Sequence, residues 1–122
     1  MTVQVVGTAN PRQAREVADQ VANSILVKTM VAGRDPNWGR VAAAVGASGV
    51  PVNLKRLTIQ LGKSVVFRNG EPSALRRKTL LKEVDHPEVG ILIDLNSGSA
   101  QAHVLSGDLT EGYISINAKY TS

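Results

Sequence analysis

The side chains that could do chemistry gather in one stretch, residues 26–46 (LVKTMVAGRDPNWGRVAAAVG), which contains the only tryptophan of the chain. Lys28 interrupts an apolar run there, so its ammonium group either points to solvent or serves a site. The segment 35–40 (DPNWGR) then places a carboxylate, an amide, an indole and a guanidinium in close succession. Ordinary core packing does not require this combination, so Lys28, Trp38 and Arg40 are candidate site or interface residues.

Outside this stretch the sequence offers few candidate catalytic residues. The chain has no cysteine, which excludes a thiolate nucleophile and disulfides and fits a cytosolic or organelle-matrix setting. His86 and His103 are isolated and lack metal-ligand spacing, so we interpret them as a turn residue and a sheet residue. Asp94 stands inside an apolar run, where a carboxylate costs free energy unless it is paired. We interpret it as a strand-end or hydrogen-bonded residue in preference to a catalyst.

Thr2 offers one further nucleophile. Removal of Met1 would expose an N-terminal threonine, whose own amine can act as the base. The sequence supplies no recognisable oxyanion hole beside it. The favoured interpretation is therefore a start residue followed by a small residue.

Length and composition limit the function classes. The 122 residues are enough for one domain with a modest core, and aromatic residues make up only 3%, so the core must be aliphatic. The net charge of +4 comes from dispersed charges, with one small basic cluster at residues 76–78 and no basic stripe interleaved with aromatics. There is no apolar run of membrane-spanning length and no signal-peptide pattern. We therefore expect a cytoplasmic protein that uses no nucleic acid, membrane, metal or cofactor.

The hydrophobic pattern predicts the elements that position these residues. Alternation predicts strands at 2–9, 57–61, 64–67, 89–95, 100–105 and 113–120. Helical spacing or capping residues predict helices at 11–23, 36–45 and 74–84. Asn10 and Asp35 are the expected N-caps, since each precedes a proline at the first helical position. The strand 89–95 is expected to be central and buried on both faces, with 100–105 as its antiparallel partner. The prediction is a single α+β domain, residues 1–122, with a mainly antiparallel sheet and helices packed on one side.

Two long segments resemble the motifs of a known family. ANSILVKTMVAGRDPNWGRVAAAVGASG (22–49) looks like the signature A-N-S-P-L-V-K-T-A, G-E-D-x-N-W-G-R and a small-residue helix of the bifunctional ornithine/glutamate N-acetyltransferase (ArgJ-type) family. IDLNSGSAQA (93–102) and GDLTEGYISINAKYTS (107–122) are similar to its D-L-N-x-G and C-D-L-T-x-x-Y-V-x-I-N-A-x-Y-x-T ending. Order and spacing agree from about residue 3 to residue 122. Departures from the pattern fall at Ile25, Arg34, Gly107, Gly112 and Ser122.

The resemblance implies the C-terminal domain of the beta chain of such an enzyme, with an ArgJ/DmpA-like fold. Members transfer acetyl from N-acetylornithine to glutamate in arginine biosynthesis through an acetyl-threonine intermediate, after autocatalytic cleavage before that threonine. The family's nucleophile and oxyanion hole belong to an upstream portion, and Thr2 does not match the nucleophile motif. This chain therefore contributes no catalytic residue. The family's substrate contacts correspond to Asn117 and Ser122, whose amide and hydroxyl suit an amino-acid ligand.

The resemblance also implies partners. These are the upstream portion (the alpha chain and the N-terminal part of the beta chain), the amino-acid substrates N-acetylornithine and glutamate, and further subunits of a homo- or hetero-oligomer. The chain alone is expected to be inactive. The alternative is a catalytically inactive, stand-alone or truncated structural or interaction module of the same fold, with Asn117 a strand-end residue and Ser122 a frayed terminus.

Overall fold

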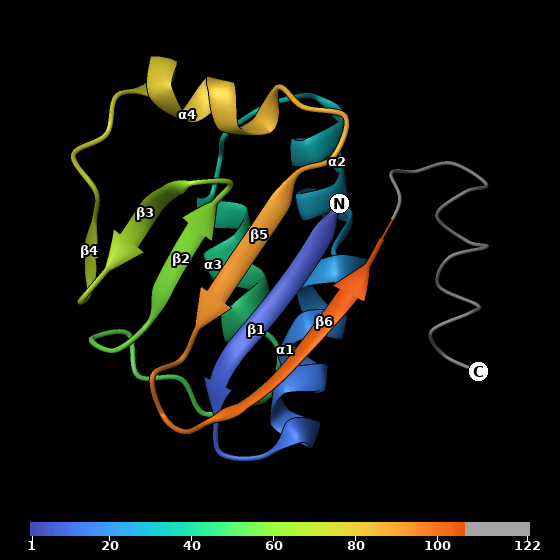
Figure 1. Cartoon of the computed structure of the whole chain (residues 1–122), viewed down its shortest axis with the longest axis vertical. Coiled ribbons are helices and arrows are strands. Elements are labelled where there is room, and N and C mark those ends of the chain that lie inside the picture. The colour runs from blue at the N-terminus through green and yellow to red at the C-terminus, as the bar shows by residue number, and fades with distance from the viewer. Residues whose placement is uncertain (107–122) are drawn as a thin grey trace.

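The computed structural model describes residues 1–106, and these form one mixed sheet with four helices (Figure 1). The strands are β1 (Thr2–Thr8), β2 (Thr58–Leu61), β3 (Ser64–Arg68), β4 (Glu71–Pro72), β5 (Gly90–Asp94) and β6 (Ala100–Leu105). The helices are α1 (Pro11–Asn23), α2 (Ile25–Ala32), α3 (Gly39–Gly46) and α4 (Arg77–Val84). The predicted α+β class is confirmed, and the predicted strand at 113–120 lies outside the described residues.

The order of the strands in the sheet is β4-β3-β2-β5-β1-β6. Only β1 and β5 run parallel, and the other four neighbouring pairs are antiparallel, so the prediction of a mainly antiparallel sheet is confirmed. β5 is central, as expected. The predicted pairing of β5 with β6 is wrong, because β6 pairs with the far edge of β1.

The chain reaches β6 by crossing the end of β1. The Leu95 N–H donates to Val6 O at 3.1 Å and the Ser97 N–H donates to Gly7 O at 2.7 Å, so the connection after β5 lies across that end. Gly98 also approaches the β1 backbone so closely that a Cβ there would overlap the carbonyl of Thr8. This turn-like sequence therefore makes a crossing and not a hairpin.

The helix α1 forms where its sequence predicts. The side chain of Asn10 accepts the Gln13 N–H at 2.9 Å and caps the first turn, which Pro11 opens. The side chains that this helix buries repeat at helical spacing and are Ala14, Val17, Ala18, Val21 and Ala22. They pack against β1 and β6 and anchor the helix to the sheet.

The next two helices differ from the prediction, since no helix was predicted at residues 25–32 and the helix predicted at 36–45 starts later. The apolar run after Ser24 is a helix, α2, because the Ser24 side chain accepts the Val27 N–H at 3.3 Å and caps it. The predicted helix start at Asp35 and Pro36 is wrong, since α3 begins only at Gly39. The Asp35 N–H donates to Met30 O at 2.9 Å, so this residue closes the end of α2 and does not open α3.

The helix α4 is also shorter than predicted. It starts at Arg77 and not at residue 74, and its N-cap, Arg76, makes no side-chain capping bond. The Leu75 N–H instead bonds to the Ser73 side chain at 3.4 Å and holds residues 73–75 in a turn. In Figure 1 this helix lies across one end of the sheet, whereas α1, α2 and α3 lie behind the sheet.

The core lies between the sheet and the helices. Its largest fully buried side chains are aliphatic, as predicted, and are Met30, Leu57, Ile59, Leu61, Ile91 and Ile93. On the opposite face of β5, Leu92 and Asp94 are only half-buried, so the expectation of burial on both faces is wrong for the described residues. Within residues 1–106 no helix is long and apolar enough to cross a membrane.

Candidate functional site

The loop between α2 and α3 carries the distinctive DPNWGR segment. Arg34 adopts a left-handed backbone conformation with φ of 53°, which turns the chain away from the end of α2. Pro36 is buried, and its carbonyl accepts the Trp38 N–H at 2.8 Å. The Arg40 N–H also donates to Asn37 O at 3.1 Å, so backbone bonds within residues 36–40 close a tight turn before α3.

Arg40 joins the two helices that flank this loop. Its Nη1 donates to Leu26 O at 3.1 Å and to Thr29 Oγ1 at 3.0 Å, both on α2. Thr29 Oγ1 in turn donates to Leu26 O at 3.0 Å. These contacts hold the start of α3 against α2, so Arg40 positions the loop.

Lys28 lies inside the molecule. Its residue exposure is 4%, so the alternative in which its ammonium group points to solvent is wrong. A buried ammonium requires polar partners, because removal of a charge from water is costly. Lys28 stays a candidate for an interior structural or site role.

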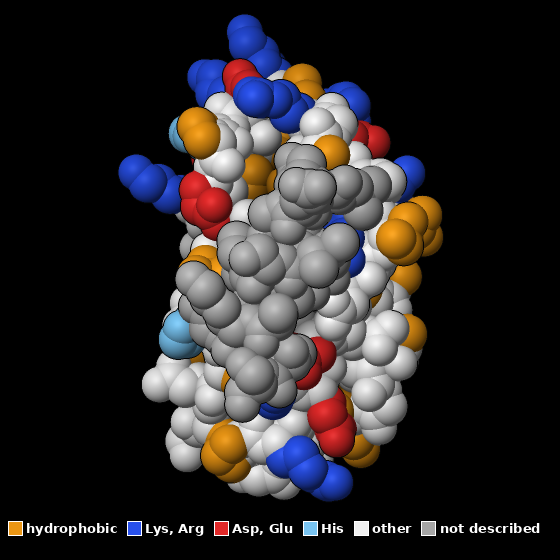
Figure 2. Space-filling model, turned by 90° about the vertical axis from the view of Figure 1, so that its right-hand side faces the viewer, with side chains coloured by type: hydrophobic (Ala, Val, Ile, Leu, Met, Phe, Trp, Pro, Cys, Tyr) orange, Lys and Arg blue, Asp and Glu red, His pale blue; other side chains and the backbone are white. Residues whose placement is uncertain are grey.

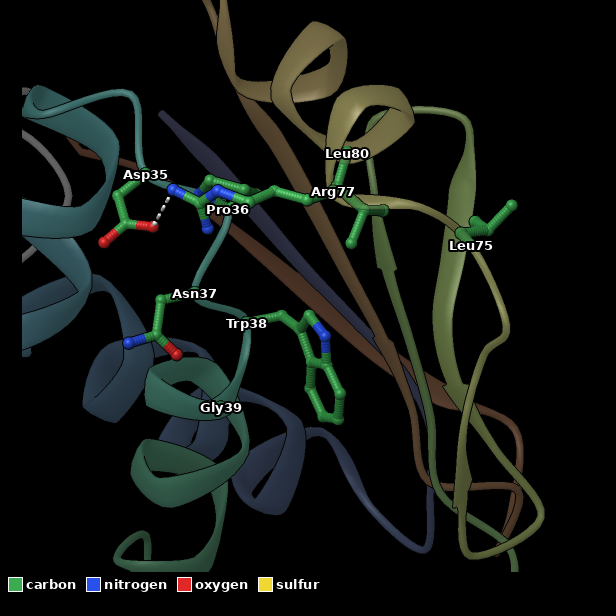
Figure 3. Close-up of a pocket in the computed structure, with 8 residues that line it drawn as sticks. All are labelled: Asp35, Pro36, Asn37, Trp38, Gly39, Leu75, Arg77 and Leu80. Atoms are coloured by element: carbon green, nitrogen blue, oxygen red, sulfur yellow. Dashed lines mark ion pairs between the residues drawn. The ribbon is translucent and has the colours of Figure 1, made fainter.

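A hollow of about 540 Å³ lies beside the loop. One wall is residues 35–39, and the other is formed by Leu75, in the turn before α4, and by Arg77 and Leu80 of α4 (Figure 3). The indole of Trp38 reaches into this space from the loop side, while the Asn37 amide points to the other side of the loop. We call this hollow the Trp38 pocket.

Two contacts lie at the walls of the Trp38 pocket. The ring centroids of Trp38 and Phe67 lie 5.8 Å apart with an interplanar angle of 43°, so the indole rests on β3. Arg77 Nη2 lies 3.6 Å from Asp35 Oδ1 at one end of the hollow. An indole, aliphatic side chains and both signs of charge therefore border the same space.

Two neighbouring loop residues pair with charged side chains at the two ends of α4. Asp35 pairs with Arg77 in the first turn of the helix, and Arg34 forms an ion pair with Asp85 just after its last turn. Figure 2 shows Lys and Arg side chains gathered at this end of the molecule, with charges of both signs dispersed elsewhere on the face shown. The wall formed by Leu75, Arg77 and Leu80 was not predicted from the sequence. Its only signal in the sequence was the basic cluster at residues 76–78.

Asp94 is a turn-forming residue at the end of β5. Its Oδ1 accepts the Asn96 N–H at 2.9 Å, and the Asn96 side-chain amide donates to Arg56 O at 2.6 Å. The interpretation of Asp94 as a hydrogen-bonded strand-end residue is confirmed. A hollow of about 500 Å³ adjoins it and is also lined by the cations Lys55, Arg56 and Arg68.

Thr2 and the N-terminus meet a single carboxylate. Thr2 Oγ1 donates to Glu88 Oε1 at 2.8 Å, and the Met1 ammonium lies 3.0 Å from the same oxygen. Partial burial pushes the pKa of Glu88 up, but these hydrogen bonds and the positive charge outweigh burial and hold that pKa below its ordinary range. Thr2 is thus committed to a structural contact while Met1 is present.

The remaining predicted residues are placed as follows. His86 lies in the exposed turn after α4 and His103 on the exposed face of β6, as interpreted from the sequence. Within residues 1–106 no group of three or more His, Asp or Glu side chains is arranged to hold a metal ion. Asn117 and Ser122 lie outside the described residues.

Known proteins resemble the chain along its whole length. A model of the ArgJ family matches residues 1–122. The arginine biosynthesis bifunctional protein ArgJ of Oceanobacillus iheyensis is 43% identical over 116 residues, which cover 95% of this chain and 28% of that protein. The protein of the same name from a Synechococcus strain is 39% identical over 129 residues, covering 98% of this chain and 31% of its own length.

The fold has a counterpart among solved structures. The crystal structure of ArgJ from Bacillus halodurans superposes with a TM-score of 0.84 at 36% sequence identity, over 98% of this chain and 56% of that chain. The chain thus spans between 28% and 31% of the length of the two curated relatives above.

Proposed function

This chain belongs to the ArgJ family, and from that premise we propose that it forms the C-terminal domain of an ornithine/glutamate N-acetyltransferase of arginine biosynthesis. The observation that carries the proposal is the family match over residues 1–122, which spans both sequence motifs. The 36% identical crystal structure with a TM-score of 0.84 supports it. The curated relatives are more than three times as long, which agrees with a separate portion that holds the reaction centre.

The proposed reaction is acyl transfer in two steps. A threonine hydroxyl on the upstream portion attacks the acetyl carbonyl of N-acetylornithine, and ornithine leaves with the proton on its amine. The amine of glutamate then attacks the acetyl-threonine ester and regenerates the hydroxyl as N-acetylglutamate forms. An oxyanion hole, also on the upstream portion, stabilises the tetrahedral intermediates.

The part assigned to this chain is substrate binding and assembly. Asn117 carries an amide that donates and accepts hydrogen bonds, and Ser122 carries a hydroxyl that does either, which suits the carboxylate and amine of an amino-acid substrate. The strand β6 leads directly toward these residues in the sequence. The chain alone is inactive in this proposal, because its nucleophile comes from elsewhere.

An inactive module of the same fold is the second candidate. The observation that favours it is the core, since residues 1–106 bury an aliphatic set of side chains without any contribution from another chain. A module of this kind would fold alone and transfer nothing, even beside the upstream portion.

Reconstitution separates the two candidates. The 122-residue chain is mixed with the upstream portion of Bacillus halodurans ArgJ that ends before the matched region, and transfer from N-acetylornithine to glutamate is measured by mass spectrometry. We expect the two to co-elute in size-exclusion chromatography and to transfer acetyl only together. Asn117→Ala should raise KM in the mixture, whereas Ser99→Ala, in an exposed turn, should not. Absence of co-elution and transfer would favour the inactive module, and transfer by the chain alone would refute the assignment of the nucleophile.

A further inference from the structure

We propose that the Trp38 pocket binds a free α-amino acid. The residues that carry this proposal are Asp35 and Arg77, with opposite charges, and Trp38, Leu75 and Leu80, with apolar walls. None of them is Asn117 or Ser122, the substrate contacts of the proposed function. The site therefore adds an amino-acid site to that function and does not depend on it.

The charged pair in the Trp38 pocket has unused binding capacity. Asp35 Oδ1 and Arg77 Nη2 are 3.6 Å apart, which exceeds the usual N–H···O hydrogen-bond distance of about 2.7–3.2 Å. Their side chains are 40% and 68% exposed, and an exposed ion pair contributes only about 0–1 kcal/mol. A ligand that separates them loses little and can bond to both.

Other charges near the loop are engaged in different contacts. Arg40 donates to two acceptors on α2, and Arg34 pairs with Asp85. Asp35 and Arg77 are thus the charged residues among those that line the hollow. Figure 3 shows the Arg77 side chain extending from α4 past Pro36, so that its guanidinium lies beside the Asp35 carboxylate.

The two signs of charge select the class of ligand. A guanidinium matches a carboxylate in a bidentate arrangement, and a carboxylate matches an ammonium group. A phosphate ester would meet the negative charge of Asp35, and a dication would meet Arg77. An α-amino acid carries its carboxylate and ammonium groups on one carbon atom, so both can reach a pair 3.6 Å apart.

The apolar walls accept the side chain of that amino acid. Trp38 lies on the loop side, held by Phe67, and Leu75 and Leu80 lie opposite (Figure 3). The volume of about 540 Å³ falls within the roughly 300–1,000 Å³ typical of small-molecule sites. A long aliphatic side chain fills this space, and a cationic one gains a further contact with the indole face.

The single tryptophan makes the test direct, because all indole fluorescence of the 122-residue chain comes from Trp38. The full chain is titrated with L-leucine, L-arginine, L-ornithine and L-glutamate, and isothermal titration calorimetry repeats each titration. We expect a saturable signal with a Kd on the order of 1 mM for at least one of them. The N-acetyl amide of the same amino acid, which lacks both charges, should give no saturable signal.

Variants locate the binding. Asp35→Asn and Arg77→Gln should each weaken binding roughly tenfold or more, the change expected when a charge-assisted contact is lost. Lys78→Gln, at the next exposed position of α4, is the matched control and should bind like the unaltered chain. Circular dichroism checks that each variant is folded, and Arg77→Lys should recover part of the affinity if Gln disturbs the helix.

Several results would overturn the proposal. The first is the absence of a saturable signal for every amino acid by both methods. The second is that the blocked amide, or inorganic phosphate, binds as tightly as the free amino acid. The third is that neither Asp35→Asn nor Arg77→Gln changes the affinity. None of these measurements involves acetyl transfer. Failure here and failure of reconstitution are therefore distinguishable.

Discussion

Gly7 and Gly49 provide a matched pair of substitutions. Gly7 has a φ of +75°, and a Cβ there would lie 2.7 Å from the backbone nitrogen of Asn96 and overlap Oδ1 of Asp94. Gly49 has a φ of +81° with no atom within 4 Å of the corresponding position. Gly49→Ala therefore measures only the free-energy cost of a positive φ for a residue with a Cβ. Gly7→Ala adds the cost of the steric overlap with the segment after β5 that crosses the end of β1.

The expected magnitudes differ by more than the error of the measurement. Gly49→Ala should lower the free energy of unfolding by about 1–2 kcal/mol, the cost of a left-handed conformation for a residue with a Cβ. Gly7→Ala should lower it by about 3–6 kcal/mol, because it also overpacks a close contact and weakens the bond between the Asn96 N–H and Asp94. A loss of that size is a large fraction of the 5–15 kcal/mol typical of a domain.

Urea unfolding followed by circular dichroism measures both losses, with Trp38 fluorescence as a second probe. Gly46→Ala is the control, since Gly46 ends α3 without a positive φ and with nothing within 4 Å of an added Cβ. It should be neutral or stabilising. Equal losses for Gly7→Ala and Gly49→Ala, within about 0.5 kcal/mol, would refute the close crossing of the β5–β6 connection over β1.

Three further predictions concern caps, helix contacts and pH. Asn10→Ala should cost about 1 kcal/mol in urea unfolding, because the Gln13 N–H loses its acceptor; an unchanged midpoint would contradict the cap. Arg40→Leu should lower the free energy of unfolding by about 1–2 kcal/mol through loss of the bonds to α2, and an unchanged Tm would argue against them. The folded pKa of Glu88 is lowered from 4.5, so its contacts with Thr2 and the N-terminus stabilise the fold above about pH 4.5, and that contribution is lost as pH falls through the lowered value. Glu88→Gln should flatten the dependence of Tm on pH in that acidic range, and an identical dependence would exclude this contact.

Capping residues and hydrophobic spacing predicted those helices and strands whose ends are set by residues close to them in the sequence. Asn10 and Pro11 start α1 as their types require, because a cap and its helix lie within one turn. The same rule failed at Asp35, whose N–H bonds to Met30 O at the end of the preceding helix. A capping signal is thus ambiguous where two helices share a short loop.

Contacts between residues far apart in the sequence could not be predicted from local patterns. The segment after β5 has the turn residues of a hairpin, and only its close approach to the end of β1 reveals a crossing. The pocket beside Trp38 needs Arg77 and Leu80, which come from a helix far along the chain. The DPNWGR segment indicated the residues of one wall. The residues of the other wall come close to it only through tertiary packing, which local patterns do not show.

The position of β1 also has a consequence for the order of folding. Thr2 pairs with Gly90 on one side and with Leu105 on the other, so β1 has both of its partners near the far end of residues 1–106. Long-range pairing of this kind slows folding, because loop closure must precede the contacts that reward it. Within residues 1–106, β1 and α1 are synthesised before β5 and β6, the strands that complete their packing, and this is the interval in which a chaperone would have most effect.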